Sequence, residues 1–174
     1  MFSDWENFYL IVGSGGGALI GVMFVVATLT AGLEESRASR GALIYITPIV
    51  FHFSIVLIVS AIAVTPGLPL EAVGTLIALC ALVGWLYAVV TAIRVFRIRI
   101  DDPPDWEDKT FYGIMPTIAY FLLACAAAAI WFAPMSAALF IGAVMLLLLL
   151  IGIRNAWDLA TYLVLRKSGS SESS

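Results

Sequence analysis

The residue best suited to chemistry is His52, the only histidine in the chain. It follows Pro48 by four residues inside a long charge-free stretch, and the same spacing recurs between Pro116 and Tyr120. Because an unperturbed imidazole titrates at about pH 6.5, a histidine in an apolar segment is a candidate for relaying protons or binding a permeating species. With equal weight, the sequence allows a neutral histidine that hydrogen-bonds to tyrosine or serine and only specifies helix packing.

The two prolines extend this hypothesis to the surrounding helices. Proline has no N–H group, so it leaves the carbonyl four residues earlier without a donor, here those of Ile44 and Tyr112. A helix commonly kinks at such a position, which can open a cavity. We therefore expect a polar path inside the membrane, formed by His52, Tyr120, Pro48, Pro116, Tyr45 and Tyr87.

Support for an enzyme is much weaker. Ser14 and His52 could form a hydrolase dyad, but no third orienting group or oxyanion motif accompanies them. Neither Lys109 nor Lys167 lies inside a predicted span, which excludes an intramembrane Schiff base, and one histidine cannot supply two axial haem ligands. Cys80 and Cys125 are isolated, as apolar filler residues would be. We expect no catalytic residues, no cofactor and no metal site.

The composition excludes a water-soluble globular protein. Hydrophobic residues make up 62% of the chain and charged residues 12%, whereas soluble domains average about 45–50% and 25%. Four long stretches contain no charged residue, namely residues 7–33, 41–70, 72–93 and 110–153. A helix needs about 20 residues to cross the bilayer core, so the first three stretches predict one span each. The last stretch, which contains Pro134, predicts two spans.

These stretches predict an all-α integral membrane protein, a bundle of five transmembrane helices. We place the spans near residues 8–33, 41–64, 70–93, 110–133 and 136–157, within a single membrane domain over residues 1–167. Residues 168–174 are polar and predict a flexible tail. Little of the chain remains outside the bilayer, which leaves no room for a soluble catalytic or nucleic-acid-binding domain.

The basic residues predict the orientation of the bundle. All nine follow the first, third or fifth span: Arg37, Arg40, Arg94, Arg97, Arg99, Lys109, Arg154, Arg166 and Lys167. Cytoplasmic loops are enriched in lysine and arginine, so we expect the N-terminus outside and the C-terminus in the cytoplasm. The chain start lacks the basic region and cleavage site of a signal peptide, so the first helix is expected to be retained. We expect a multi-pass protein of a bacterial inner membrane, with the bilayer as partner and anionic lipid at Arg94, Arg97 and Arg99.

An internal repeat relates the second and third spans to the fourth and fifth. An ungapped shift of 68 residues aligns Pro48 with Pro116, Pro66 with Pro134, Gly74 with Gly142, and Gly84 with Gly152. The alternative is a coincidence of ordinary helix kinks and turns. A genuine repeat would consist of two parallel hairpins related about an axis along the membrane normal, with the first helix unpaired.

The first helix carries glycines at four-residue spacing, Gly13, Gly17 and Gly21. Such a smooth face lets another helix approach to backbone contact, and close van der Waals packing of this kind drives helix association in lipid. The partner is either another subunit, which would give a homo-oligomer, or the hairpins of the same chain.

Near the end of the fifth span, Arg154 and Asp158 are four residues apart, a spacing that predicts an ion pair on one helix face. One interpretation is a cytoplasmic gate or anion contact. The favoured one is an interfacial anchor with Trp157.

Together these features favour a small homo-oligomeric channel or carrier for an ion or small solute. The alternative is a non-catalytic structural, accessory or lipid-binding membrane subunit that uses the same faces to dock a partner. An intramembrane serine/histidine hydrolase is a remote third hypothesis.

Overall fold

The computed structural model describes residues 2–31, 37–97 and 106–171, with side chains described for 4–28, 46–97 and 106–162. Every element in these ranges is helical: η1 (Phe2–Trp5), α1 (Glu6–Ala31), α2 (Arg37–Val64), α3 (Leu70–Arg97), α4 (Trp106–Asp108), η2 (Lys109–Ile114), α5 (Met115–Ala128), η3 (Ala129–Trp131) and α6 (Pro134–Ser171). Five segments are long and apolar enough to cross a membrane: Glu6–Thr28, Ile46–Val64, Leu70–Arg97, Trp106–Trp131 and Pro134–Tyr162. For the described part of the chain, the expected all-α fold with five such helices is confirmed.

Two of these segments differ in detail from the ranges expected from the sequence. The fourth is not one regular α-helix, because the π-helical η2 precedes α5 and the 3-10 helix η3 follows it. The fifth belongs to α6, which continues without interruption to Ser171, beyond the predicted domain end at residue 167.

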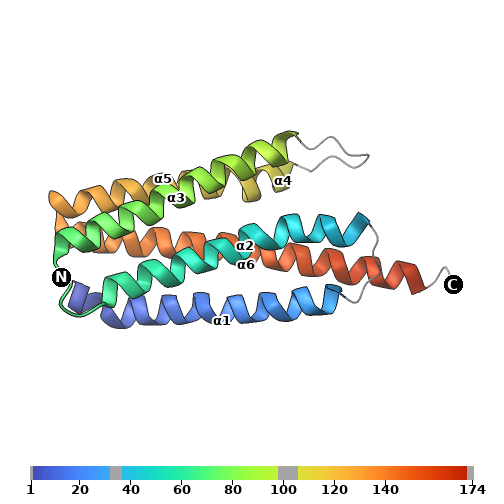
Figure 1. Cartoon of the computed structure of the whole chain (residues 1–174), viewed down its shortest axis with the longest axis horizontal. Coiled ribbons are helices and arrows are strands. Elements are labelled where there is room, and N and C mark those ends of the chain that lie inside the picture. Colours follow the sequence, from blue (N-terminus) through green and yellow to red (C-terminus); the bar gives the residue numbers. More distant parts are fainter. Residues whose placement is uncertain (1, 32–36, 98–105, 172–174) are drawn as a thin grey trace.

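Figure 1 shows the long helices running side by side. One end, called the N-terminal end here, holds η1 and the turns that join α2 to α3 and α5 to α6. Gly67 in the α2–α3 turn has a φ of 74°, a conformation that favours glycine. The opposite end, called the basic end, holds Arg94 and Arg97 of α3 and Lys109 of η2.

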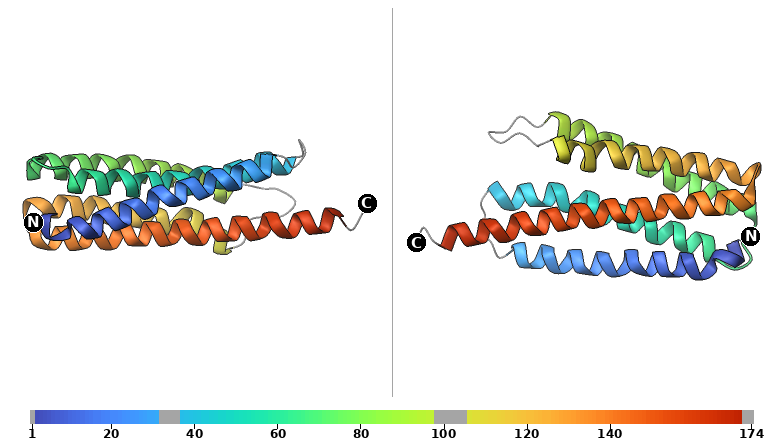
Figure 2. Two further views of the ribbon diagram at one scale, coloured as in Figure 1. Left: turned by 90° about the horizontal axis from the view of Figure 1, so that it is seen from below. Right: turned by 180° about the vertical axis from the view of Figure 1, so that it is seen from behind.

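The helices pack in an order that differs from their order along the chain. α1 packs mainly on α2, α3 packs mainly on α5, and α6 contacts both α2 and α5. In Figure 1, α1 therefore lies at one edge, the α3–α5 pair at the other, and α2 with α6 between them. The right-hand view in Figure 2 shows the same order, and both views show the extension of α6 past its neighbours toward the C-terminus.

Aromatic rings fill the space next to two glycines, one where α3 packs on α5 and one where α2 packs on α6. The Tyr120 ring of α5 occupies the space that a Cβ atom on Gly84 of α3 would need. In the same way, the Phe53 ring of α2 occupies the space next to Gly152 of α6. Both rings are fully buried. Close approach at a small residue maximises van der Waals contact, which is what holds helices together in lipid.

We predict that Gly84→Ala destabilises the bundle by about 1–3 kcal/mol, because the added methyl group would collide with the Tyr120 ring in a packed interior. The measurement is the unfolding free energy in detergent micelles. Gly15→Ala is the matched control, since no atom lies within 4 Å of its Cβ position. Its stability should stay within about 1 kcal/mol of the parent protein or increase, because alanine favours helix. Equal stability of the two variants would contradict the proposed fit.

Candidate intramembrane polar site

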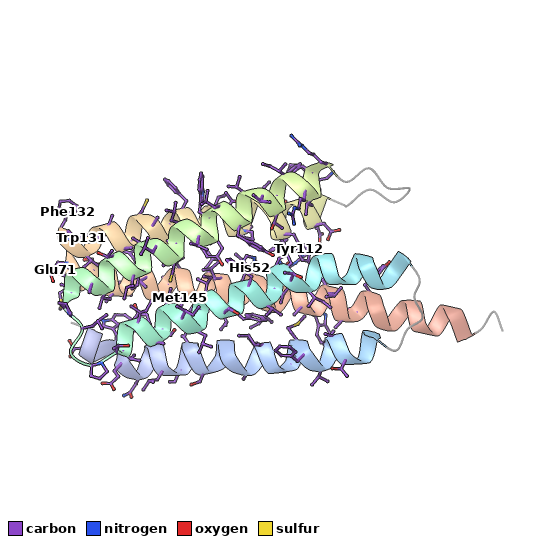
Figure 3. The ribbon with its side chains drawn as sticks, in the orientation of Figure 1. His52, Glu71, Tyr112, Trp131, Phe132 and Met145 are labelled. Carbon is purple, nitrogen blue, oxygen red and sulfur yellow. The ribbon has the colours of Figure 1, made fainter. Side chains whose placement is uncertain are left out.

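His52 and Tyr120 meet in the middle of the bundle. The Nδ1 atom of His52 and the hydroxyl oxygen of Tyr120 are 2.9 Å apart in a buried hydrogen bond between α2 and α5. The exposed fraction is 1% for His52 and 0% for Tyr120, so both polar groups are shielded from the surroundings of the bundle. The hydroxyl donates when Nδ1 is unprotonated and accepts when Nδ1 carries the proton. Figure 3 shows His52 midway between the two ends.

Aromatic side chains enclose this pair. Phe51 stacks on Tyr87 of α3, with ring centroids 4.0 Å apart and planes inclined by 25°. The same Phe51 ring makes edge contacts with His52 and Tyr120 at centroid distances of 6.1 Å and 6.4 Å. Together with Gly84, whose missing side chain leaves room for Tyr120, these rings hold the imidazole and the phenol in place.

Five of the six residues predicted to form the polar path come together around this hydrogen bond or one helical turn from it. Pro48 and Pro116 are both buried, each one turn before a member of the pair. Tyr87 is half-buried and stacks on Phe51, whose ring also contacts Tyr120. The side chain of Tyr45 lies outside the described residues.

The carbonyl that lacks a backbone donor because of Pro116 is one residue away from the expected one. Because η2 is π-helical, Met115 donates its N–H to the carbonyl of Thr110, five residues earlier. In this register, the group that loses its donor to proline is the carbonyl of Phe111 and not that of Tyr112. The Nδ2 atom of Asn155 donates to the Phe111 oxygen at 3.0 Å and so replaces the missing backbone donor.

Asn155 is therefore a site residue that the sequence-based prediction left out. It is fully buried on α6, and its own backbone carbonyl accepts a 3.0 Å hydrogen bond from the hydroxyl of Tyr112. Its Oδ1 atom is buried without a hydrogen-bond partner. A signal was available, because Asn155 is one of only two asparagines in the chain and stands at the end of the longest apolar stretch.

Arg154 pairs with a different carboxylate from the one predicted. Its Nη2 atom lies 2.8 Å from Oε2 of Glu107 on α4, and its guanidinium carbon lies 3.7 Å above the centre of the Phe111 ring. Asp158 is exposed, and no ion pair joins it to Arg154 among the described contacts. The pairing across the bundle arises because α4 and η2 pack beside α6, which sequence spacing along one helix does not reveal.

The glycines of the predicted face of α1 do not all pack against another helix. Gly13 packs against α2, where an added Cβ atom would lie 2.7 Å from Cβ of Ser60. Gly16, outside the predicted stripe, also packs closely on α2, with 3.1 Å from the added Cβ position to the Phe53 carbonyl oxygen. Gly17 has only an ordinary contact with α2, and Gly21 is exposed. The tight crossing of α1 is thus made within the chain.

The remaining candidate residues lie apart from the polar pair or outside the described part. Ser14 is exposed on α1, and no described hydrogen bond joins it to His52. Cys80 and Cys125 are free thiols, half-buried and exposed. Within the described residues, no group of histidine, cysteine or carboxylate side chains could hold a metal ion. Arg94 and Arg97 are exposed at the basic end, while Arg99 lies outside the described residues.

The chain matches no protein-family model, no curated protein and no solved structure. Its function must therefore be inferred from the geometry of the site.

We predict that Asn155→Ala lowers the unfolding free energy by about 1–3 kcal/mol, because it leaves the Phe111 carbonyl buried without a donor. The measurement is the unfolding free energy of the purified protein in detergent. Asn7→Ala is the control, because Asn7 is the other asparagine and is exposed. If both variants were equally stable, the amide would not be replacing a lost backbone bond.

Proposed function

We propose that this protein is a small membrane carrier for an ion or small polar solute, and that His52 and Tyr120 form its intramembrane polar site. The observation that carries the proposal is the buried hydrogen bond between an ionisable imidazole and a phenol at mid-depth in an apolar bundle. Ionisable groups at this depth are costly and commonly mark ion or proton pathways. The helices on which they lie, α2 and α5, belong to the two halves of the predicted repeat.

A carrier fits the packing better than a permanently open channel does. Tyr120, His52 and Phe53 are almost completely buried, and the rings of Tyr120 and Phe53 close the space at Gly84 and Gly152. Conduction through an open pore would require a continuous polar lining. In the proposed cycle, the two helix pairs move relative to each other and the His52–Tyr120 bond breaks and reforms.

The proposal includes two parallel hairpins related by a pseudo-two-fold axis along the membrane normal. Three observations support this arrangement. His52 and Tyr120, which are counterparts in the 68-residue shift, touch each other, as counterparts do only near the axis. The pairings of α3 with α5 and of α2 with α6 are exchanged by such a rotation. Gly84 and Gly152, also counterparts, each receive an aromatic ring from the first helix of the other hairpin.

We further propose a homo-oligomer in a bacterial inner membrane, with the basic end in the cytoplasm. The basic residues support the orientation because cytoplasmic loops are enriched in lysine and arginine. The exposed small residues of α1, Ser14, Ala18 and Gly21, support the oligomer because they would allow a second helix to approach closely.

A second candidate function is a non-conducting accessory or lipid-binding subunit. It is favoured by the close packing of aromatic rings on glycines, which a static scaffold also needs. In that case the His52–Tyr120 bond would only specify how the helices pair.

We predict that His52→Gln strongly reduces the flux of solute or protons in proteoliposomes. The substitution should also remove the change of this flux between about pH 5 and 8, because glutamine cannot titrate there. Tyr120→Phe should reduce flux as well, because it removes the hydroxyl that bonds to Nδ1. Ser54→Ala is the control, because the Ser54 hydroxyl bonds only to the Val50 carbonyl of its own helix. Flux that stays pH-dependent and undiminished in folded His52→Gln protein would end the proposed role. A parent protein that gives no flux but co-purifies with a stable partner would favour the accessory function.

We predict that cysteines introduced at Ser3 and Ser171 react with an impermeant thiol reagent from opposite sides of the membrane, since five spans separate them. The Ser171→Cys protein should react from the cytoplasmic side. The background for both is Cys80→Ala with Cys125→Ala, which removes the native thiols. Labelling of both positions from one side would contradict the orientation and the number of spans.

A further inference from the structure

One face of α2 is covered by α1 within the chain. A Cβ atom added to Gly13 of α1 would lie 2.7 Å from Cβ of Ser60, and one added to Gly16 would lie 3.3 Å from Cγ1 of Val56. Beneath α1, the exposed fraction is 0% for Val56 and 2% for Ser60. This face of α2 therefore serves as the docking surface for an antiparallel helix.

The equivalent face of α5 is open. In the 68-residue shift, the counterparts of Val56 and Ser60 are Ala124, which is half-buried, and Ala128, which is exposed. Between them Cys125 is an exposed free thiol. Among the described elements, the main contacts of α5 are with α3, α6 and the adjoining η2 and η3. The open face consists of small side chains, which allow another helix to approach closely in lipid.

The outward face of α1 is open as well and has a similar surface. Ser14, Ala18 and Gly21 are exposed, and their spacing of four and three residues places them on one helical stripe. This stripe lies away from Gly13 and Gly16, which pack on α2. Neither face carries a charged residue, because the charge-free stretches 7–33 and 110–153 contain both of them.

The positions of the two open faces suit contact between copies. In Figure 1, α1 lies at one edge of the bundle and the α3–α5 pair at the other. Both α2 and α5 run toward the N-terminal end, where the α2–α3 and α5–α6 turns lie. A second copy in the same orientation would therefore bring its α1 antiparallel to α5, as α1 meets α2 within the chain.

We infer that the face of α5 formed by Ala124, Cys125 and Ala128 binds α1 of a second copy of this chain, through Ser14, Ala18 and Gly21. Each copy offers one face of each kind, so the contact is head-to-tail and closes when the copies form a ring. This inference rests on the homo-oligomer and the repeat in the proposed function, and it names the surface that each copy contributes.

The contact within the chain predicts the register between copies. Gly17 of α1 lies against Leu57 of α2, with 3.9 Å from its added Cβ position to Cδ1. The counterpart of Leu57 is Cys125, so in the same register Ala18, the next residue on the outward stripe, lies opposite Cys125 of the neighbouring copy. The test is a disulfide between these two positions.

Ala18→Cys is introduced into Cys80→Ala protein, which keeps the native Cys125 thiol. The control pairs Ala18→Cys with Leu79→Cys in the Cys80→Ala, Cys125→Ala background, because Leu79 is exposed on α3 at about the same depth by helical rise. Both proteins are oxidised with copper phenanthroline in proteoliposomes at several lipid-to-protein ratios. The products are separated on a non-reducing gel.

We expect the Ala18→Cys protein to form a ladder that extends beyond the dimer, because every copy carries one thiol on each face. Its rate should exceed that of the control at least about tenfold, since thiols held in one contact have a high effective concentration. Equal rates would overturn the inference, because lipid would then cover α5. A dimer that persists in the Ala18→Cys, Cys125→Ala protein would retain the homo-oligomer but overturn the docking on α5. Cross-linking of Cys125 to a different co-purified protein would overturn it too.

A bulky substitution tests the same surface without a disulfide. In otherwise unmodified protein, Ala128→Phe should weaken association several-fold in native-like lipid while leaving the fold intact, because the Ala128 side chain is exposed within one chain. Leu79→Phe, also at an exposed position, should leave association unchanged. Unaltered association of the Ala128→Phe protein would overturn the inference.

Flux measurements on the parent protein separate this contact from the carrier proposal. A ladder without any flux would support the contact and reject the carrier. Flux that depends on His52 without a ladder would keep the carrier and overturn the contact.

Discussion

The close fit of the Tyr120 ring over Gly84 sets how near α5 can approach α3. Water-driven hydrophobic association does not operate between helices in lipid, so contacts of this kind hold the bundle together. Phe53 meets Gly152 between α2 and α6 in the same manner. Because the phenol oxygen of Tyr120 bonds to His52, the same fit also fixes the polar pair in the interior.

A second constraint comes from Pro116 and is met from another helix. The π-helical register of η2 leaves the Phe111 carbonyl without a backbone donor, and an unpaired carbonyl in hydrocarbon costs several kcal/mol. The amide of Asn155 on α6 supplies the donor, while the Tyr112 hydroxyl bonds in return to the backbone of α6. These bonds, with the Arg154–Glu107 ion pair, join α6 to the α4–η2–α5 segment at the basic end.

The two constraints act at different depths. Buried apolar clusters lie on both sides of His52, one toward the N-terminal end and one, which includes Ile46 and Val95, toward the basic end. At mid-depth the helix pairs are joined by the His52–Tyr120 bond, and further toward the basic end by hydroxyl, amide and charged groups.

The sequence by itself determined the fold class and the approximate ranges of the long helices, because charge-free apolar stretches of this length favour helices long enough to cross a bilayer. It also singled out His52 and Tyr120, since an isolated histidine and a repeated proline spacing are visible without coordinates. Only the tertiary structure decided that the two residues bond to each other, that Arg154 pairs with Glu107 instead of Asp158, and that Gly16 packs closely on α2. Only the structure showed Asn155 as the partner of the Phe111 carbonyl. Helical periodicity relates residues within one helix, whereas these contacts depend on the rotation and register of neighbouring helices, which side-chain packing between helices determines.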